Sequence, residues 1–260
     1  MGRLCMGRHG TSKSRRAPRW KATRDGGIEL SEQDGVLSLH LGSNLIQSAM
    51  RLDRPNDLEI AYTRCMMGFL LFRPAPRDVL MIGLGGGSLA KFVHHHLPRT
   101  HITAVEINPQ VIAAARNFFA LPPESERLLV LEGDGAEYVA SHPACCDVLL
   151  VDGFDDGVLP AALGSEEFFA AAAAALRPNG IMVMNLLGRD RRLNTYLKRI
   201  QSCFPGDCLL LPAEPDDNVV VFGLHQRLNK RRRQAVMARA AGLEKKYRLP
   251  LEQFVRELFG

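Results

Sequence analysis

Alternation of short apolar runs with helical segments between residues 78 and 187 constrains the fold of this chain more than any other feature. Buried strands are expected at residues 78–83, 102–106, 128–132, 147–152 and 180–187. Helices are expected between them, at residues 88–97, 136–141 and 165–176, and from Pro109 onward behind an Asn108 cap. Strands and helices that alternate through right-handed crossovers form a doubly wound sheet. The sequence therefore predicts an α/β fold with a mostly parallel, Rossmann-like sheet.

The segments after residue 187 indicate which kind of doubly wound sheet this is. A helix is expected at residues 191–203, followed by strands at 208–212 and 219–224 around the turn residues Pro215-Asp-Asp-Asn218. Two strands joined by so short a turn form a hairpin, so one of them runs antiparallel to the rest of the sheet. This ending is typical of the methyltransferase-type sheet and separates it from the sheet of dinucleotide-dependent dehydrogenases.

The flanking segments predict a chain of four parts. Residues 1–24 show no periodicity and are expected to be a disordered basic head. Residues 25–72 predict a small β-ribbon, with strands at 28–30, 36–41 and 45–52 and a turn at Asp34-Gly35, and then a helix at 58–72. Residues 73–225 form the Rossmann-like nucleotide-binding domain, and residues 226–260 a basic helical appendix with a break near Pro250.

Charge is distributed unevenly along the 260 residues. The formal net charge is +5, of which the head contributes +8 and the appendix +7, so the body between them carries −10. An acidic body suits a cationic substrate. The basic ends are expected to be solvated extensions, and nucleic acid is not an expected partner because no basic strand is rich in aromatic residues.

Cysteine use and hydropathy bear on location. The six cysteines are scattered without metal-binding spacing, which indicates reduced thiols in a cytoplasmic protein, and no metal site is expected. No uninterrupted apolar run is long enough for a membrane span, so no membrane is expected as a partner.

A glycine-rich loop, Gly83-Leu-Gly-Gly-Gly-Ser88, joins the first strand of the regular region to its helix. Glycines at Gly83, Gly85 and Gly87 allow the backbone to approach a nucleotide, and the following helix offers its N-terminal N–H groups. From Gly85 to Ala90 the loop also fits a dinucleotide fingerprint. On its own, a tight turn explains the loop equally well.

Acidic residues follow the next strands. Glu106 ends the second strand, where a carboxylate can accept hydrogen bonds from both ribose hydroxyls. Asp134, beside Gly135, follows the third strand and can accept from an adenine amine, although it could also simply cap the next helix. Asp152 and Asp155 follow the fourth strand, where such sheets hold the reacting groups. With Asp156 they would raise one another's pKa, which suits a base, and a turn rich in Asp is the alternative.

These residues together resemble the polyamine aminopropyltransferases, above all the spermidine synthases and their bacterial spermidine synthase-like relatives. The resemblance extends from about residue 45 to 187 and rests on ordered motifs: Gln47-Ser, Tyr62, the glycine loop, Val105-Glu-Ile, Gly133-Asp-Gly and Val151-Asp-Gly-Phe-Asp155. It implies decarboxylated S-adenosylmethionine as donor, an amine acceptor and a homodimer. It also implies that Glu106 holds the ribose, Asp134 the adenine and Asp155 the proton of the amine. Gln47 then lines the nucleotide site, and Tyr62 lines the amine groove.

The motifs also depart from the family pattern. Gly86 stands where the family has an aspartate that grips the donor's ammonium, and Tyr62-Thr63-Arg64 stands for Tyr-His-Glu. Asp155-Asp156 replaces Asp-Pro. We expect Gly86 to leave more room in the loop. Decarboxylated and intact S-adenosylmethionine should therefore bind within about tenfold of each other.

The leading hypothesis is an aminopropyltransferase that transfers an aminopropyl group to an amine such as putrescine. The alternatives are a methyltransferase that uses S-adenosylmethionine itself, a non-catalytic protein that binds a nucleotide or docks its basic ends on nucleic acid, and a nicotinamide oxidoreductase. Mass spectrometry of the products with both sulfonium donors would separate the first three.

Overall fold

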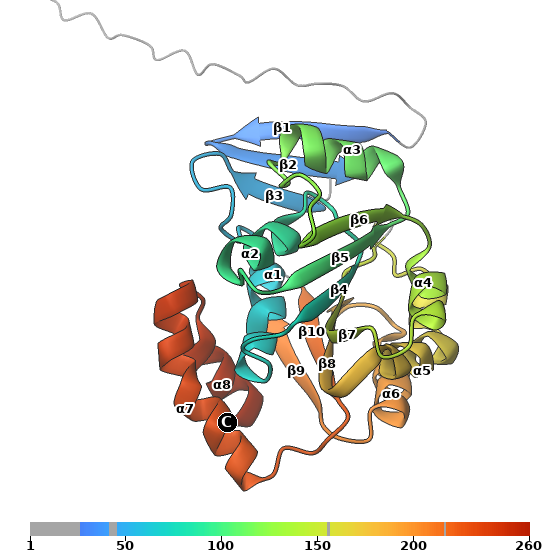
Figure 1. Ribbon diagram of the computed structural model, residues 1–260, viewed down its shortest axis with the longest axis vertical. Helices are drawn as coiled ribbons and strands as arrows, with labels where there is room; N and C mark the ends of the chain where they lie inside the picture. Colours follow the sequence, from blue (N-terminus) through green and yellow to red (C-terminus); the bar gives the residue numbers. More distant parts are fainter. Residues whose placement is uncertain (1–26, 42–45, 155–156, 216) are drawn as a thin grey trace, which may run out of the picture.

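The computed structural model describes residues 27–41, 46–154, 157–215 and 217–260. The expected disordered head and the predicted site residue Asp155 lie outside the described residues. The described chain forms a three-stranded sheet above a seven-stranded sheet with helices on both faces of the larger one (Figure 1).

The seven-stranded sheet has the order β6-β5-β4-β7-β8-β10-β9. Its strands are β4 (Asp78–Ile82), β5 (His101–Glu106), β6 (Leu128–Glu132), β7 (Cys146–Val151), β8 (Leu176–Leu187), β9 (Cys208–Ala213) and β10 (Asn218–Leu224). Parallel pairing joins β6, β5, β4, β7 and β8, whereas β10 runs antiparallel to both β8 and β9. The predicted fold class, with one antiparallel strand near its end, is confirmed.

Two apolar layers hold the sheet between its helices. The helices are α2 (Ser88–His96), α3 (Pro109–Phe118), α4 (Gly135–Ser141), α5 (Glu166–Ala175), α6 (Leu193–Cys203) and the short 3-10 helix η2 (Ala162–Gly164). In β4, Val79 and Met81 pack into the layer that contains α2, whereas Leu80 and Ile82 pack into the layer under α4, α5 and α6. This alternation is the two-residue period of a strand that is buried on both faces.

Local sequence accounts for the starts of the helices. The Asn108 side chain accepts a hydrogen bond from the Gln110 amide, with Pro109 in the first helical position of α3. Ser165 caps α5 in the same way, and two glutamates follow it in the first turn, where the helix dipole favours negative charge. Both caps satisfy amides that would otherwise lack partners.

The three-stranded sheet consists of β1 (Ile28–Gln33), β2 (Val36–Leu41) and β3 (Ser48–Arg51), all antiparallel. Asp34 and Gly35 both have positive φ, 53° and 75°, as a two-residue hairpin turn requires. Buried Leu39 and Met50 pack against Ala114 and Phe119 of the α3 region. The predicted ribbon is therefore present and lies on the main sheet's helical layer.

One expected helix is shorter than predicted. Instead of a helix over residues 58–72, the structure has α1 (Ala61–Met66) followed by the 3-10 helix η1 (Met67–Leu71). Ile60 is extended, and the Arg64 guanidinium donates to the carbonyl oxygens of Leu58 and Glu59 at 2.8 and 2.7 Å. These bonds hold the preceding segment outside the helix, a constraint that apolar spacing does not reveal.

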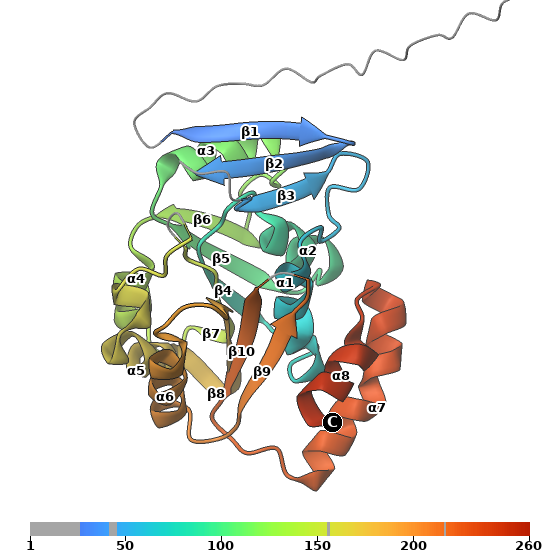
Figure 2. The same ribbon diagram turned by 180° about the vertical axis from the view of Figure 1, so that it is seen from behind.

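The C-terminal segment forms α7 (Lys230–Tyr247) and α8 (Leu251–Phe259), separated at Arg248, whose φ is 56°, just before Pro250. Figure 2 shows both helices beside β9 and the α1 segment. Val236, Tyr247 and Phe254 are buried in the same apolar layer as η1. The appendix is thus packed against the body, as an extension of its core. Within the described residues, no helix is both long and apolar enough to cross a membrane.

Candidate active site

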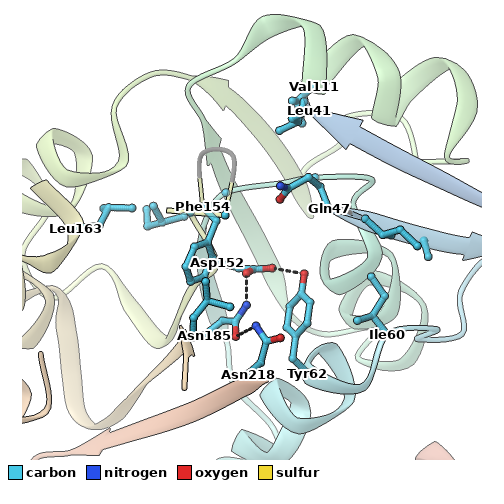
Figure 3. A pocket seen from close by; sticks show the side chains of 18 of the residues that line it. Leu41, Gln47, Ile60, Tyr62, Val111, Asp152, Phe154, Leu163, Asn185 and Asn218 are labelled. Atoms are coloured by element: carbon cyan, nitrogen blue, oxygen red, sulfur yellow. Dashed lines mark hydrogen bonds between the residues drawn. The ribbon is translucent and has the colours of Figure 1, made fainter. Parts of the chain in front are cut away.

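A cavity of about 770 Å³ lies at the carboxyl ends of the parallel strands, below the three-stranded sheet (Figure 3). Eight of the residues predicted for the site line it: Gln47, Tyr62, Gly83, Gly85, Glu106, Asp134, Gly135 and Asp152. The chain runs outward from β4 to β6 and then returns to β7 on the other side of β4. The cavity therefore lies where strand order reverses, the place at which open α/β sheets bind ligands.

The glycine loop needs its glycines for conformation as well as for access. Gly83, Gly85 and Gly87 have φ values of 89°, 53° and 72°, a region that L side chains rarely occupy. A Cβ on Gly83 would also overlap the backbone carbonyl oxygen of Asp152. Gly87 does not line the cavity; its amide donates to the Leu84 carbonyl at 2.9 Å as the chain enters α2.

Gly86 does not leave the room expected from the sequence. A Cβ built on it would lie 2.6 Å from Cδ1 of Phe119 and 2.8 Å from Oγ of Ser48. Phe119 and Ser48 therefore fill the space beside the loop. The expectation of a roomier loop is wrong, because the sequence does not show which distant side chains pack there.

Glu106 is fixed by backbone amides at the end of β5. One carboxylate oxygen accepts from the Leu84 amide at 2.9 Å and the other from the Asn108 amide at 3.0 Å. The residue is 9% exposed and lines the cavity next to the glycine loop. A carboxylate oxygen can accept more than one hydrogen bond, so both oxygens can still receive hydroxyl donors.

Asp134 caps α4, which is the structural alternative that the sequence left open. Its Oδ1 accepts from the amides of Ala136 and Glu137 at 2.7 and 3.1 Å. Both bonds use the same oxygen, so the cap does not engage Oδ2. The residue therefore caps the helix through one oxygen and also lines the cavity.

Asp152 lies at the centre of a hydrogen-bonded network in the cavity (Figure 3). Tyr62 donates its hydroxyl to Oδ2 at 3.0 Å, and the Asn185 side-chain amide donates to Oδ1 at 2.9 Å. Asn218 in turn donates to the Asn185 side-chain oxygen at 2.9 Å. These residues come from α1, β8 and β10, so the network joins the antiparallel strand β10 to the carboxyl ends of the parallel strands.

Burial raises the pKa of Asp152 above its ordinary value of 3.8. The hydrogen bonds from Asn185 and Tyr62 oppose this effect because they stabilise the charged carboxylate, and repulsion from Glu106 adds to it. A carboxylate that holds a proton more tightly than usual is suited to proton transfer.

Asn185 and Asn218 were not predicted as site residues. Asn185 is 2% exposed within the apolar run of β8. A buried amide is costly unless it is hydrogen-bonded, so a lone Asn in such a run could have indicated a polar partner nearby. Asn218 lies in the predicted turn, and the sequence offers no comparable indication for it.

The cavity as a whole is lined by more acidic than basic side chains. Five carboxylates line it, those of Glu59, Glu106, Asp134, Asp152 and Asp217, against two guanidiniums, Arg64 and Arg189. Nε of Arg189 lies 3.9 Å from Oδ2 of Asp217, and Arg64 donates to backbone carbonyl oxygens. Acid thus predominates among the described lining residues, as a cationic ligand requires. Gln47 lines the same cavity, with its side chain directed into it in Figure 3.

Across the described part of the chain, no group of three or more His, Cys, Asp or Glu side chains is arranged to hold a metal ion.

The sequence of this chain is similar to those of known proteins. The spermine/spermidine synthase domain matches residues 59–198. A polyamine aminopropyltransferase of Chromobacterium violaceum is 43% identical over 231 residues, which cover 89% of this chain and 88% of that protein. A second polyamine aminopropyltransferase, from Neisseria meningitidis, is 43% identical over 232 residues, with the same coverage of both chains.

Two solved structures resemble the fold. Spermidine synthase of Thermotoga maritima superposes with a TM-score of 0.73 at 20% identity, over 93% of this chain and 84% of that one. Human methyltransferase-like protein 13, solved in complex with SAH, gives a TM-score of 0.61 at 28% identity, over 78% of this chain and 95% of that one.

Proposed function

This chain is a polyamine aminopropyltransferase of the spermine/spermidine synthase family, and we propose that it transfers the aminopropyl group of decarboxylated S-adenosylmethionine to a small amine such as putrescine. The observation that carries the proposal is the single cavity that gathers the glycine loop, Glu106, Asp134 and Asp152 at one edge of the sheet. Family membership favours aminopropyl transfer over the methyl transfer that the same fold can support.

The nucleoside of the donor would lie between Glu106 and Asp134. Glu106, oriented by the Leu84 and Asn108 amides, accepts from the ribose hydroxyls, and Asp134 accepts from the adenine amine through the oxygen that does not cap α4. The backbone of Gly83 and Gly85 borders the same space without side chains in the way. Charged hydrogen bonds of this kind contribute about 1.5–3 kcal/mol each.

The donor's ammonium needs a partner other than position 86. Gly86 carries no carboxylate, and Phe119 and Ser48 occupy the space beside it. If Asp155 accepts the proton of the amine, Asp152 is our candidate for this partner, because it lines the cavity and the Tyr62 and Asn185 bonds fix its carboxylate there. An ion pair with Asp152 would favour decarboxylated S-adenosylmethionine, whose tail is cationic, over intact S-adenosylmethionine, whose tail also carries a carboxylate. The weak discrimination expected from Gly86 alone stays the alternative prediction, and titration of both donors distinguishes the two.

Transfer requires the acceptor to attack as a free amine. The amine nitrogen forms a bond to the methylene carbon beside the sulfonium, and the carbon–sulfur bond breaks with its electron pair on sulfur. The leaving group is neutral methylthioadenosine, and one proton passes from the amine to a carboxylate. The protein therefore has to align two substrates and accept a proton.

Asp152 is our candidate for the proton acceptor, because burial raises its pKa and two neutral donors fix its orientation. Asp155, the base implied by the family motif, stays a candidate for the same step or for holding the acceptor amine. Asparagine substitutions at the two positions would distinguish these roles.

The acceptor would enter past Tyr62 and Arg64. The excess of carboxylates in the cavity supports an amine that carries more than one positive charge. Arg64, in place of the glutamate of the family motif, makes this end less acidic. A homodimer, implied by the resemblance, stays a prediction that light scattering would test.

Product analysis tests the proposed function. Purified protein is incubated with putrescine and either decarboxylated or intact S-adenosylmethionine, and the products are identified by mass spectrometry. We expect methylthioadenosine and spermidine from the decarboxylated donor. A methylated amine from the intact donor, with no aminopropyl product, would contradict the proposal.

A further inference from the structure

A second hollow, of about 370 Å³, lies at the amino end of β8, between that strand, the end of β10 and α7. We call it the arginine groove, after Arg73, Arg232 and Arg239, which line it. Its volume is within the range of small-molecule sites. The proposed function makes no use of it.

The titratable side chains that line the groove are all basic. They are the three arginines and His225, and no carboxylate lines it among the described residues. The active-site cavity has the opposite character, with five carboxylates and two arginines. Within one molecule, the two hollows are therefore complementary to ligands of opposite charge.

Two of the arginines come from one face of α7. Arg232, Ala235, Val236 and Arg239 recur with helical spacing and all line the groove. Arg232 donates to the Asn179 side-chain oxygen at 3.3 Å, and Arg239 donates to the Leu71 carbonyl at 3.2 Å. Both partners are neutral, so these bonds orient the guanidiniums without compensating their charge.

The third arginine has an unmet donor. Arg73 donates through Nη2 to Oδ1 of Asp147 at 2.6 Å, but its buried Nε meets no acceptor in the described part of the chain. Buried donors in native proteins nearly always have a partner, from the protein, from water or from an ion. A ligand in the groove cannot be that partner, because the Nε atom is closed off from the surface. Asp147 compensates the charge of Arg73, so Arg232 and Arg239 are the arginines of the groove that form no ion pair in the described part of the chain.

The floor of the groove is apolar. We give this name to Phe72, Ile181, Leu224 and Val236, four apolar residues that line the groove together with the arginines. An inorganic anion would leave this surface uncovered, whereas an organic anion with a flat ring would cover it and place its charge at the rim. Arginine forks match phosphate oxygens in pairs.

We propose that the arginine groove binds an organic phosphate of nucleotide size, with its phosphates at Arg232 and Arg239 and its ring over the apolar floor. Ile181 lines the groove, while Asn185, four residues further along β8, lines the active-site cavity. At about 3.3 Å per residue, the two sites are about 13 Å apart along one strand. The ligand is therefore a third molecule, separate from donor and acceptor.

Calorimetric titration tests this site. Uridine triphosphate is the probe, because it lacks the adenine that the active-site cavity is proposed to bind, and titrations are run with and without saturating methylthioadenosine. We expect binding in both cases, tighter than that of inorganic phosphate. Arg232→Gln should weaken it about tenfold, the effect of losing one charged hydrogen bond.

The matched control is Lys245→Gln, which removes the same charge from an exposed position of α7 outside the groove. Its affinity should equal that of the wild type, and circular dichroism of both variants should show the wild-type helix content. Competition by methylthioadenosine, affinity no better than that of inorganic phosphate, or equal losses in the two variants would each overturn the proposal. So would binding of only a single-stranded RNA, weakened alike by both variants, because that outcome assigns the charge to a nucleic-acid surface on α7.

Discussion

Asn185→Leu isolates the contribution of one hydrogen bond to the proposed proton transfer. The substitution keeps a side chain of similar size in the buried strand but removes the donor 2.9 Å from Oδ1 of Asp152. A hydrogen bond to a charged group contributes about 1.5–3 kcal/mol, and a change of one pKa unit corresponds to about 1.4 kcal/mol. Because this bond stabilises the carboxylate, its loss should raise the pKa of Asp152 by about one to two units.

The assay is the pH dependence of kcat/KM for methylthioadenosine formation. If Asp152 accepts the proton, the acidic limb of the profile should move toward higher pH by that amount in Asn185→Leu. Asn218→Ala is the control, since Asn218 donates to the Asn185 oxygen and makes no bond to Asp152 in the network. Its acidic limb should move much less. An unshifted limb in a folded Asn185→Leu protein would refute the assignment of Asp152 as the base.

Three further predictions concern binding and stability. Glu106→Ala should weaken methylthioadenosine binding about tenfold to a hundredfold by calorimetry, since two ribose bonds depend on that carboxylate; wild-type affinity would mean that the ribose is held elsewhere. Gly86→Ala should lower the free energy of unfolding in urea by about 1–3 kcal/mol, because its Cβ would meet Phe119 at 2.6 Å, whereas Gly242→Ala, with open space around its Cβ, should not destabilise. Asp152→Asn should raise the thermal midpoint at neutral pH. Burial raises the pKa of Asp152 in the folded state, so the ionised carboxylate destabilises the fold at pH values above that raised pKa. The destabilisation is absent at pH values below the pKa of the unfolded state. A lower midpoint of Asp152→Asn at neutral pH would contradict this.

Most of the seven-stranded sheet could be predicted because short stretches of sequence specify its strands, turns and helix starts. Strand β7, for example, is buried along its whole length and apolar apart from Asp147. The Asn108-Pro109 and Asp34-Gly35 pairs specify a helix start and a turn by their own conformational preferences. The family expected from the ordered motifs is confirmed by the domain match and by the curated relatives. Helix α1 was predicted too long because the Arg64 side chain binds the carbonyl oxygens of Leu58 and Glu59 and holds them out of the helix, a local contact that apolar spacing does not reveal.

The site was predicted unevenly for the same reason. Glu106 and Asp152 follow strands that were recognised, so strand order alone brought them to one cavity. The crowding of Gly86 by Ser48 and Phe119 depends on contacts between segments that lie far apart in the sequence. Asn185 contacts Asp152 only because β8 pairs with β7, which no local pattern specifies.

The most direct measurement of the central claim is the single-turnover rate of methylthioadenosine formation in Asp152→Asn, with decarboxylated S-adenosylmethionine and putrescine both saturating. The asparagine keeps the shape of the side chain and its place between Tyr62 and Asn185, but it cannot accept the proton. We predict a rate at least about 10²-fold below that of the wild type, with methylthioadenosine affinity essentially unchanged. A wild-type rate in Asp152→Asn, with the loss appearing only in Asp155→Asn, would contradict the account.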